Sequence, residues 1–346
     1  MFASLALNTF TAGSVDALTK CMNDIEAILT NNTTQVNNLT FFVAGAPSEI
    51  SRNAVSCGYD SATGLGWQVY ENTNYYTRVF RAKNSEAPSN YLYLRITLTN
   101  TSTYGLDINM VIGDLLSTGT NTNQCDPKAI NTNAYTVIPD NATSASNSRL
   151  FIHASKEHVF FHSRNVEDSI LGTPSYYVPM VAGILPFPRS GKAKTGNYPL
   201  NFISNNNGNL FYGGQITKLW NTSNTDVTVQ AYTSMASASG LNPNISTSTN
   251  ISITATSPSA KVYSDSGVTE HVLFPYVIAI SNIGLVFGNE TYDSVSKKFG
   301  LYEGHTYSQS TNWYESVVRD GQEYIALRYA DSTAASYYRI VWVKKG

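Results

Sequence analysis

The sequence predicts a mainly β protein, made of one or two antiparallel β-sandwich domains with one short amphipathic helix near the N-terminus. Three observations lead to this fold class. Of the 346 residues, 34 are Asn, 38 Ser and 36 Thr, whereas charged residues make up only 13%, which excludes coiled coils and helical solenoids. Apolar and polar residues alternate along most of the chain after residue 40. Turn-forming residues rather than helical patterns separate the alternating runs, as in antiparallel sandwiches.

The predicted helix covers residues 15–29, directly after Ser14, which is a good N-cap. Val15, Leu18, Met22 and Ile25 recur at intervals of three and four residues, and a polar run rich in Asn and Thr follows. The residues before the helix are more apolar than a free terminus needs. We expect them to form either a first strand packed in the core or an arm that docks on a neighbouring subunit.

The clearest strand is residues 91–99, where Leu92, Leu94 and Ile96 point to one side and Tyr91 and Tyr93 to the other. Similar runs predict further strands at residues 75–82, 106–112, 150–153, 158–162, 177–185, 226–232, 251–256, 277–287, 323–329 and 337–344. The pair Asp320 and Gly321 indicates a tight hairpin turn.

Three units are predicted along the chain. Residues 1–40 form the N-terminal arm and helix, and residues 41–195 form a β-sandwich-like domain. Residues 196–346 form a second β-rich domain, either separate from the first or continuous with it.

The charge balance excludes several classes of partner. The 22 Lys and Arg against 24 Asp and Glu give a net charge of −2, with no run of one sign. Nucleic acid is therefore not expected as the main partner, and neither is a charged membrane surface. Three cysteines, Cys21, Cys57 and Cys125, cannot all pair within one chain and are expected as free thiols of a reducing cytoplasm.

No catalytic, cofactor or metal site is predicted. His153, His158 and His162 lie close in sequence, but residues four apart on a strand are about 13 Å from each other, too far to share one ion. The sequence of residues 189–196, RSGKAKTG, lacks the Gly and the Ser or Thr that a phosphate loop needs. Glu167 and Asp168 are adjacent acids whose side chains would point apart on a strand. The chain is therefore expected not to be an enzyme.

Tyrosine is abundant, with 23 residues. Tyrosine packs well on half-buried sheets, and it is also enriched in protein interfaces that are poor in Lys and Glu. Low charge and many tyrosines together favour surfaces covered by other subunits. The candidate intersubunit contacts are the apolar residues of the N-terminal arm and the outward tyrosines of the clearest strand: Phe2, Leu5, Leu7, Phe10, Tyr91 and Tyr93.

Several blocks give the chain a family resemblance. They are WQVY (67–70), YYTRVFRAKN (75–84), LFIHASKEHVFFH (150–162), GILPFPRS (183–190) and a C-terminal block from FGLYEGHTY (299–307) through RDGQEYIALRYA to YYRIVWVKKG. In these blocks the chain resembles virion structural proteins of tailed bacteriophages, of the tail, baseplate or neck type. The resemblance implies a non-enzymatic subunit that contacts copies of itself and other virion proteins, in a particle assembled in the host cytoplasm. It transfers no catalytic residue.

Two alternative functions remain open from the sequence. The length and composition also suit a capsid subunit with two jelly rolls. Tyr and Trp platforms would suit a tail module that binds a glycan of the host surface, which adds a possible glycan to the expected partners.

Overall fold

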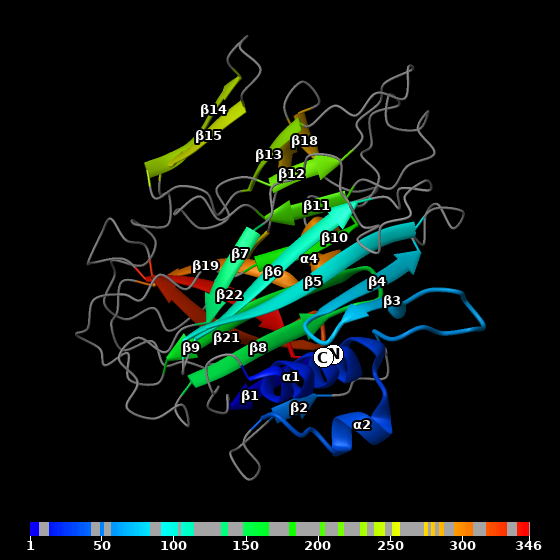
Figure 1. Cartoon of the computed structure of the whole chain (residues 1–346). Helices are drawn as coiled ribbons and strands as arrows, with labels where there is room; N and C mark the ends of the chain where they lie inside the picture. Colours follow the sequence, from blue (N-terminus) through cyan, green and yellow to red (C-terminus); the bar gives the residue numbers. More distant parts are fainter. Residues whose placement is uncertain are drawn as a thin grey trace, which may run out of the picture.

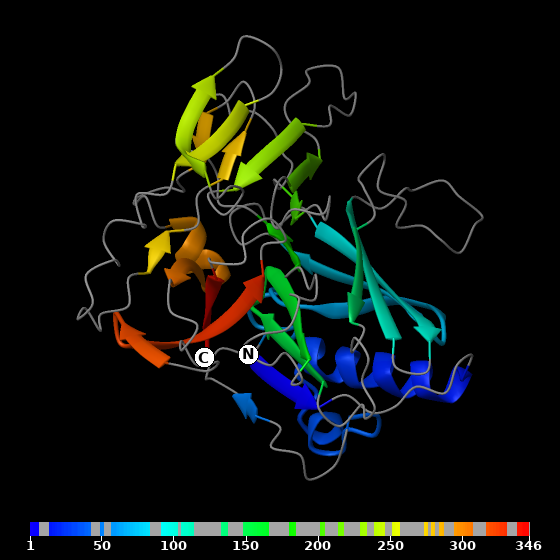
Figure 2. The ribbon, with the colours of Figure 1, turned by 90° about the vertical axis from the view of Figure 1, so that its left-hand side faces the viewer.

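The structure, a computed structural model, describes residues 1–6, 14–42, 49–51, 57–83, 91–102, 105–113, 133–137, 148–165, 180–184, 201–204, 214–217, 229–233, 239–245, 251–256, 273–275, 278–280, 284–286, 294–306, 316–330 and 338–345 (Figure 1). The described part is mainly β, and the pairings between its strands are antiparallel, as the sequence predicts. The two chain ends lie close together in both views (Figures 1 and 2).

Helix α1 (Val15–Thr30) is the longest helix of the described residues. Ser14 caps it, because its side chain accepts a hydrogen bond from the Ala17 N–H at 3.3 Å. Asn31 ends it with a left-handed φ of 52°. Leu18, Met22 and Ile25 are buried, whereas Val15 is 51% exposed, so the apolar stripe begins one turn later than the spacing indicates. A short helix, α2 (Thr33–Asn37), follows.

Asp24 connects α1 to the chain beyond α2. Its buried carboxylate accepts hydrogen bonds from the Thr40 N–H at 3.1 Å and from the Phe41 N–H at 2.9 Å. Burial raises the pKa of this carboxyl group, and the backbone hydrogen bonds work against that rise. This contact holds Phe41 and Phe42 in the core beside α1.

A five-stranded sheet contacts α1 through β3, β4 and β5. Its strands, in spatial order, are β3 (Gln68–Asn74), β4 (Thr77–Lys83), β5 (Tyr91–Ser102), β6 (Gly105–Gly113) and β7 (Asn133–Val137). The buried leucines and isoleucine of β5 face the core, as their alternation predicts. A bulge in β3 at Tyr70 shifts the register against β4.

A ten-stranded sheet runs through most of the molecule. Its strands, in spatial order, are β18 (Gly284–Val286), β17 (Ile278–Ile280), β13 (Val229–Thr233), β12 (Gly214–Thr217), β11 (Asn201–Ser204), β10 (Met180–Ile184), β9 (His158–Asn165), β8 (Ser148–Ala154), β1 (Phe2–Ala6) and β2 (Glu49–Ser51). Strand β1 therefore lies between β2 and β8. Strand pairing in this sheet crosses residue 40 and residue 195, so the three predicted units share one sheet.

Two further sheets complete the described elements. One has five strands, in the order β16 (Phe274–Pro275), β19 (Leu301–Thr306), β22 (Tyr338–Lys344), β21 (Gln322–Ala330) and β20 (Ser316–Arg319), with helix α4 (Ser294–Phe299) before β19. The other pairs β14 (Ser239–Ile245) with β15 (Ile251–Thr256). Asp320 and Gly321 both have positive φ, 51° and 72°, in the two-residue turn between β20 and β21, which confirms the predicted hairpin.

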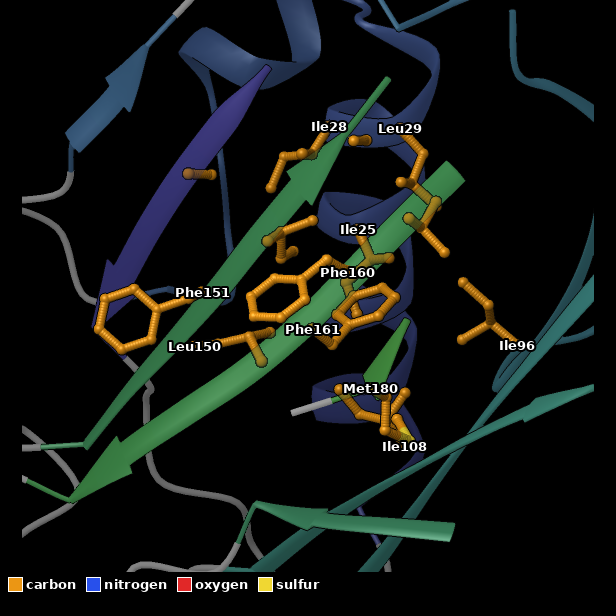
Figure 3. Close-up of a cluster of buried hydrophobic side chains, with 14 of the residues drawn as sticks. Ile25, Ile28, Leu29, Ile96, Ile108, Leu150, Phe151, Phe160, Phe161 and Met180 are labelled. Carbon is orange, nitrogen blue, oxygen red and sulfur yellow. The ribbon is translucent and has the colours of Figure 1, made fainter. Parts of the chain in front are cut away.

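The core is continuous across these layers. One cluster of buried side chains contains residues of β1, α1, β5, β6, β8, β9, β10, β19, β21 and β22. Figure 3 shows part of it, with Ile25 of α1, Ile96 of β5 and Phe161 of β9 gathered together. On β9, both the even-numbered and the odd-numbered side chains from His158 to His162 are buried, so this strand is covered on its two faces.

Candidate functional site

The outward face of β4 and β5 carries aromatic and basic side chains. In β5, Tyr91, Tyr93 and Arg95 alternate with buried leucine and isoleucine side chains, so all three point away from the core. The strand pairing places Lys83 opposite Tyr91 and Arg81 opposite Tyr93. Together with Tyr70 of the β3 bulge, these residues form what we call the tyrosine–arginine face: Tyr70, Arg81, Lys83, Tyr91, Tyr93 and Arg95.

Arg81 is at the centre of the tyrosine–arginine face. Its guanidinium carbon lies 4.8 Å from the ring centroid of Tyr91 and 5.2 Å from that of Tyr70, so two rings hold one cation. Its Nη2 atom donates a hydrogen bond to Oε1 of Gln68 at 3.3 Å. The Tyr70 and Tyr93 rings meet edge to face, with centroids 5.1 Å apart. These contacts fix the position of the guanidinium.

The face offers hydrogen-bond donors. Burial raises the pKa of Tyr93, and this outweighs the lowering effect of its hydrogen bond with Arg81. The phenol therefore stays protonated at neutral pH and keeps an O–H donor. The Lys83 ammonium lies 5.4 Å from the Tyr91 centroid. Phenol hydroxyls beside guanidinium and ammonium groups can donate hydrogen bonds to acceptor groups and anions.

The predicted N-terminal contacts have a different place. Phe2 and Leu5 are fully buried in the core of their own chain, where β1 pairs with β8 and β2. The Phe2 ring stacks on Phe151 at 6.4 Å. For these two residues, packing inside the chain replaces the intersubunit contact that we expected, because a five-residue apolar strand completes a sheet better than it serves as a free arm. Leu7 and Phe10 lie outside the described residues.

A second polar cluster lies at the turn of the β8–β9 hairpin. Nδ1 of His153 is 3.1 Å from Nε2 of His158, and Nδ1 of His158 contacts Oγ of Ser155. The Ser155 hydroxyl oxygen accepts from the Glu157 N–H, so its proton is free to go to His158. His158 then donates from Nε2 to His153. The turn is also tied to the start of β3, because the Trp67 indole N–H donates to the Ser155 carbonyl at 2.8 Å.

Burial dominates the electrostatics of this hairpin. It lowers the pKa of both His153 and His158 well below 6.5, and the N-terminal ammonium group lowers both further. Glu157, also buried, pairs with the Lys298 ammonium at 2.9 Å. The Phe299 ring packs at a tilt against His158, with centroids 5.2 Å apart, and Gly300 lies against the His153 ring. The two imidazoles are therefore neutral packing residues of the core.

His162 is separate from this pair, between the rings of Phe151 and Phe160 at 6.1 and 6.4 Å. Among the described residues, no group of three or more His, Cys, Asp or Glu side chains is placed to hold a metal ion. Likewise, no helix within the described part is long and apolar enough to cross a membrane. The phosphate-loop-like residues 189–196 and the acidic pair Glu167 and Asp168 lie outside the described residues.

Sequence reasoning missed two features of these clusters. It compared histidines four residues apart on one strand, whereas His153 and His158 meet across a hairpin. The short polar SKE turn between two apolar runs was the available signal. It also treated Tyr91 and Tyr93 without the basic residues beside them. Arg81 and Lys83 alternate within the neighbouring run TRVFRAK, and a pairing of adjacent strands brings the two patterns together.

Comparisons with known proteins add no family. No family model matches the chain, and no curated protein matches it. The fold and the candidate site together define a mainly β, antiparallel protein with a tyrosine- and arginine-bearing sheet face.

Proposed function

We propose that the chain is a non-enzymatic structural subunit of a tailed-phage virion, of the tail, baseplate or neck. It acts through contacts with copies of itself and with other virion proteins, and it is assembled in the host cytoplasm. The resemblance of its sequence blocks and its low charge support this proposal. The observation that carries it is the tyrosine–arginine face.

This face has the composition of an interface. Tyr and Arg are the residues most enriched among those that dominate binding energy, and both occur here on rigid strands. Tyr70 is 36% exposed and Tyr93 is partly exposed, so a neighbouring subunit would bury further surface on both. Because the rings already hold each other and Arg81, little side-chain entropy is lost when a partner binds.

A sandwich arrangement of the sheets is part of the proposal. The five-stranded β3–β7 sheet and the ten-stranded sheet contribute to the same core cluster, and β10 contacts β5. We propose that they pack as the two layers of an antiparallel β-sandwich, with the N-terminal amphipathic helix against its edge. Such a rigid scaffold would hold the tyrosine–arginine face in one orientation in each copy of the subunit.

The test is to purify the virus particles, identify the chain among their proteins by mass spectrometry, and locate it by cryo-electron microscopy. We expect it in the tail, baseplate or neck. Absence from the particles would overturn the proposal. A position in hexagonal capsomers would favour the capsid alternative, and a position at the host-facing tip with a hit on a glycan array would favour the glycan-binding alternative.

The face is tested in the same particles by Tyr70→Ala with Tyr93→Ala. We expect incorporation of the subunit to fall at least about tenfold, because each tyrosine of an interface centre contributes about 2 kcal/mol. The matched control is Tyr59→Ala, since Tyr59 is 48% exposed and does not belong to the face. If the double variant and the Tyr59→Ala control lost incorporation equally, or if neither lost it, the result would contradict the role of the face.

A further inference from the structure

We infer that the tyrosine–arginine face binds a carboxylate-rich segment of a neighbouring protein. The inference rests on the proposed function, since it gives the chemistry of the partner that a structural subunit would hold at this face. Three observations support it: the positive charge of the face, the burial of the guanidinium Nε atoms, and the arrangement of the tyrosine rings.

The face has more positive than negative charge. Arg81 is two residues from Lys83 on β4 and diagonally opposite Arg95 on β5, and neighbours of this kind lie about 5–8 Å apart. Within the described part of the chain, no ion pair involves any of the three. Glu71 shares the face, opposite Val79, and it takes part in none of those pairs. A partner with several carboxylates would compensate this charge.

The guanidinium groups are partly removed from water already. The Nε atoms of Arg81 and Arg95 are buried, and neither has a hydrogen-bond partner in the described residues. An incoming anion therefore displaces less water from these cations than from fully solvated ones, and its attraction to them is screened less. Arg81 already donates from Nη2 to Gln68. The N–H donors that the two guanidinium groups do not yet use suit carboxylate oxygens, which arginine binds with paired N–H donors.

The geometry of the rings favours a protein over a nucleic acid. Single strands bind to proteins by stacking bases on open aromatic faces. Here the faces of Tyr70 and Tyr91 are taken by the Arg81 guanidinium, and Tyr70 meets Tyr93 edge to face. What remains available is phenol hydroxyls and cations, which pair with carboxylates. A chain of net charge −2 also lacks the further basic residues that several phosphate contacts need.

The test measures binding of a fluorescent oligoglutamate peptide to the full chain by anisotropy. An oligoglutamine peptide of equal length and an oligothymidylate of equal charge serve as comparison probes. We expect oligoglutamate to bind, oligoglutamine not to bind, and the affinity for oligoglutamate to fall as salt rises. Absence of oligoglutamate binding, or equal or tighter binding of oligothymidylate, would overturn the inference.

Variants locate the binding. Arg81→Gln with Arg95→Gln should weaken oligoglutamate binding at least about tenfold, a typical effect of removing close charge partners. Lys20→Gln with Lys297→Gln makes the same change of net charge at two exposed lysines elsewhere and should leave the affinity unchanged. Equal weakening by the two pairs would overturn the assignment to this face.

A charge reversal guards against loss of folding. Arg81→Glu with Arg95→Glu makes the face net negative, because Glu71 shares it and only Lys83 remains positive. This variant should lose oligoglutamate binding and gain binding of an oligolysine peptide, a gain that a misfolded face would not produce. A folded variant of this kind that still binds oligoglutamate like wild type would contradict the inference. These outcomes are separate from the location of the subunit in the particle. The peptide assay could fail in a proven virion protein, and the chain could be absent from particles yet bind oligoglutamate.

Discussion

Nδ1 of His153 and Nε2 of His158 lie 3.1 Å apart in a buried contact between neighbouring strands. This contact needs one imidazole to donate and the other to accept, so Nδ1 of His153, the acceptor, must stay unprotonated. If His153 took up a proton on Nδ1, two N–H groups would face each other. The described charged groups around the pair, the Met1 ammonium, Lys298 and Lys344, oppose protonation as well, and Glu157 is engaged by Lys298.

Acid should therefore destabilise the protein from about pH 6.5 downward, the pKa of an unfolded histidine. The folded-state pKa of both rings is lowered, so below that pH the unfolded chain binds protons that the folded chain does not. Each histidine should reduce the free energy of unfolding by up to about 1.4 kcal/mol per pH unit. Urea unfolding, followed by circular dichroism at several pH values between about 7.5 and 5, measures how the free energy of unfolding changes with pH. His158→Gln should flatten this dependence, and a wild-type slope near zero would contradict the prediction.

Replacement of Arg78 by Met should destabilise the contact between α1 and β4. Arg78 is 8% exposed, its Nε lies 3.0 Å from Oε2 of Glu26, and its Nη2 donates to Oδ1 of Asn23 at 3.1 Å. Its Nη1 also donates to the Asn74 and Thr77 carbonyls. Loss of the guanidinium leaves these acceptors unpaired, at a cost of about 2–4 kcal/mol. Chemical unfolding gives the value. Lys20→Met, which removes the exposed pair with Asp16, should cost under about 0.5 kcal/mol.

Gly300→Ala should cost more stability than Gly321→Ala. Both glycines have left-handed φ, 65° and 72°, so each substitution has the same conformational penalty of about 1–2 kcal/mol. A Cβ atom at Gly300 would stand 2.9 Å from Cε1 of His153 and 3.0 Å from Cβ of Lys344, whereas one at Gly321 would meet nothing within 4 Å. The difference between the two melting temperatures isolates the packing clash. Equal shifts in melting temperature would contradict this prediction, because they would show that the His153 ring moves aside without cost.

Cys57 should not react with thiol reagents in the folded protein. Its thiol is fully buried and donates to the Ile28 and Leu29 carbonyls at 3.3 and 3.2 Å, near the end of α1. Burial raises its pKa to about 11, so little reactive thiolate forms at pH 8. Alkylation at about pH 8, followed by peptide mass spectrometry, should modify Cys57 only after addition of guanidinium chloride. Labelling of Cys57 in the native protein would contradict the buried position.

The elements that the sequence predicts well are those with uninterrupted alternation. Residues 91–99 and 251–256 correspond closely to β5 and β15, because every second side chain there is apolar. Strand β3 was missed because its sequence QVYENTN is mostly polar, and only its pairing with β4 makes it a strand. The predicted strand at residues 277–287 is two strands, β17 and β18, which pair antiparallel with each other.

Only part of the candidate site could be predicted from the sequence. The outward direction of Tyr91 and Tyr93 follows from the period of two, which is a local property. The insertion of Arg81 between Tyr70 and Tyr91 depends on the register of three strands and on a bulge, which no local pattern specifies. The same reason explains Phe2 and Leu5, whose partners on β8 lie about 145 to 151 positions away in the chain.

That separation has a consequence for synthesis on the ribosome. Strand β1 pairs with β8, which is translated much later. This partner strand therefore does not exist when β1 leaves the ribosome. At the usual speed of elongation the apolar segment must wait roughly 7–30 s before its partner strand is made. During this interval Phe2 and Leu5 are unprotected. The nascent chain therefore depends on α1, which is made directly afterwards and packs in the same core, or on chaperones to keep this segment from aggregating.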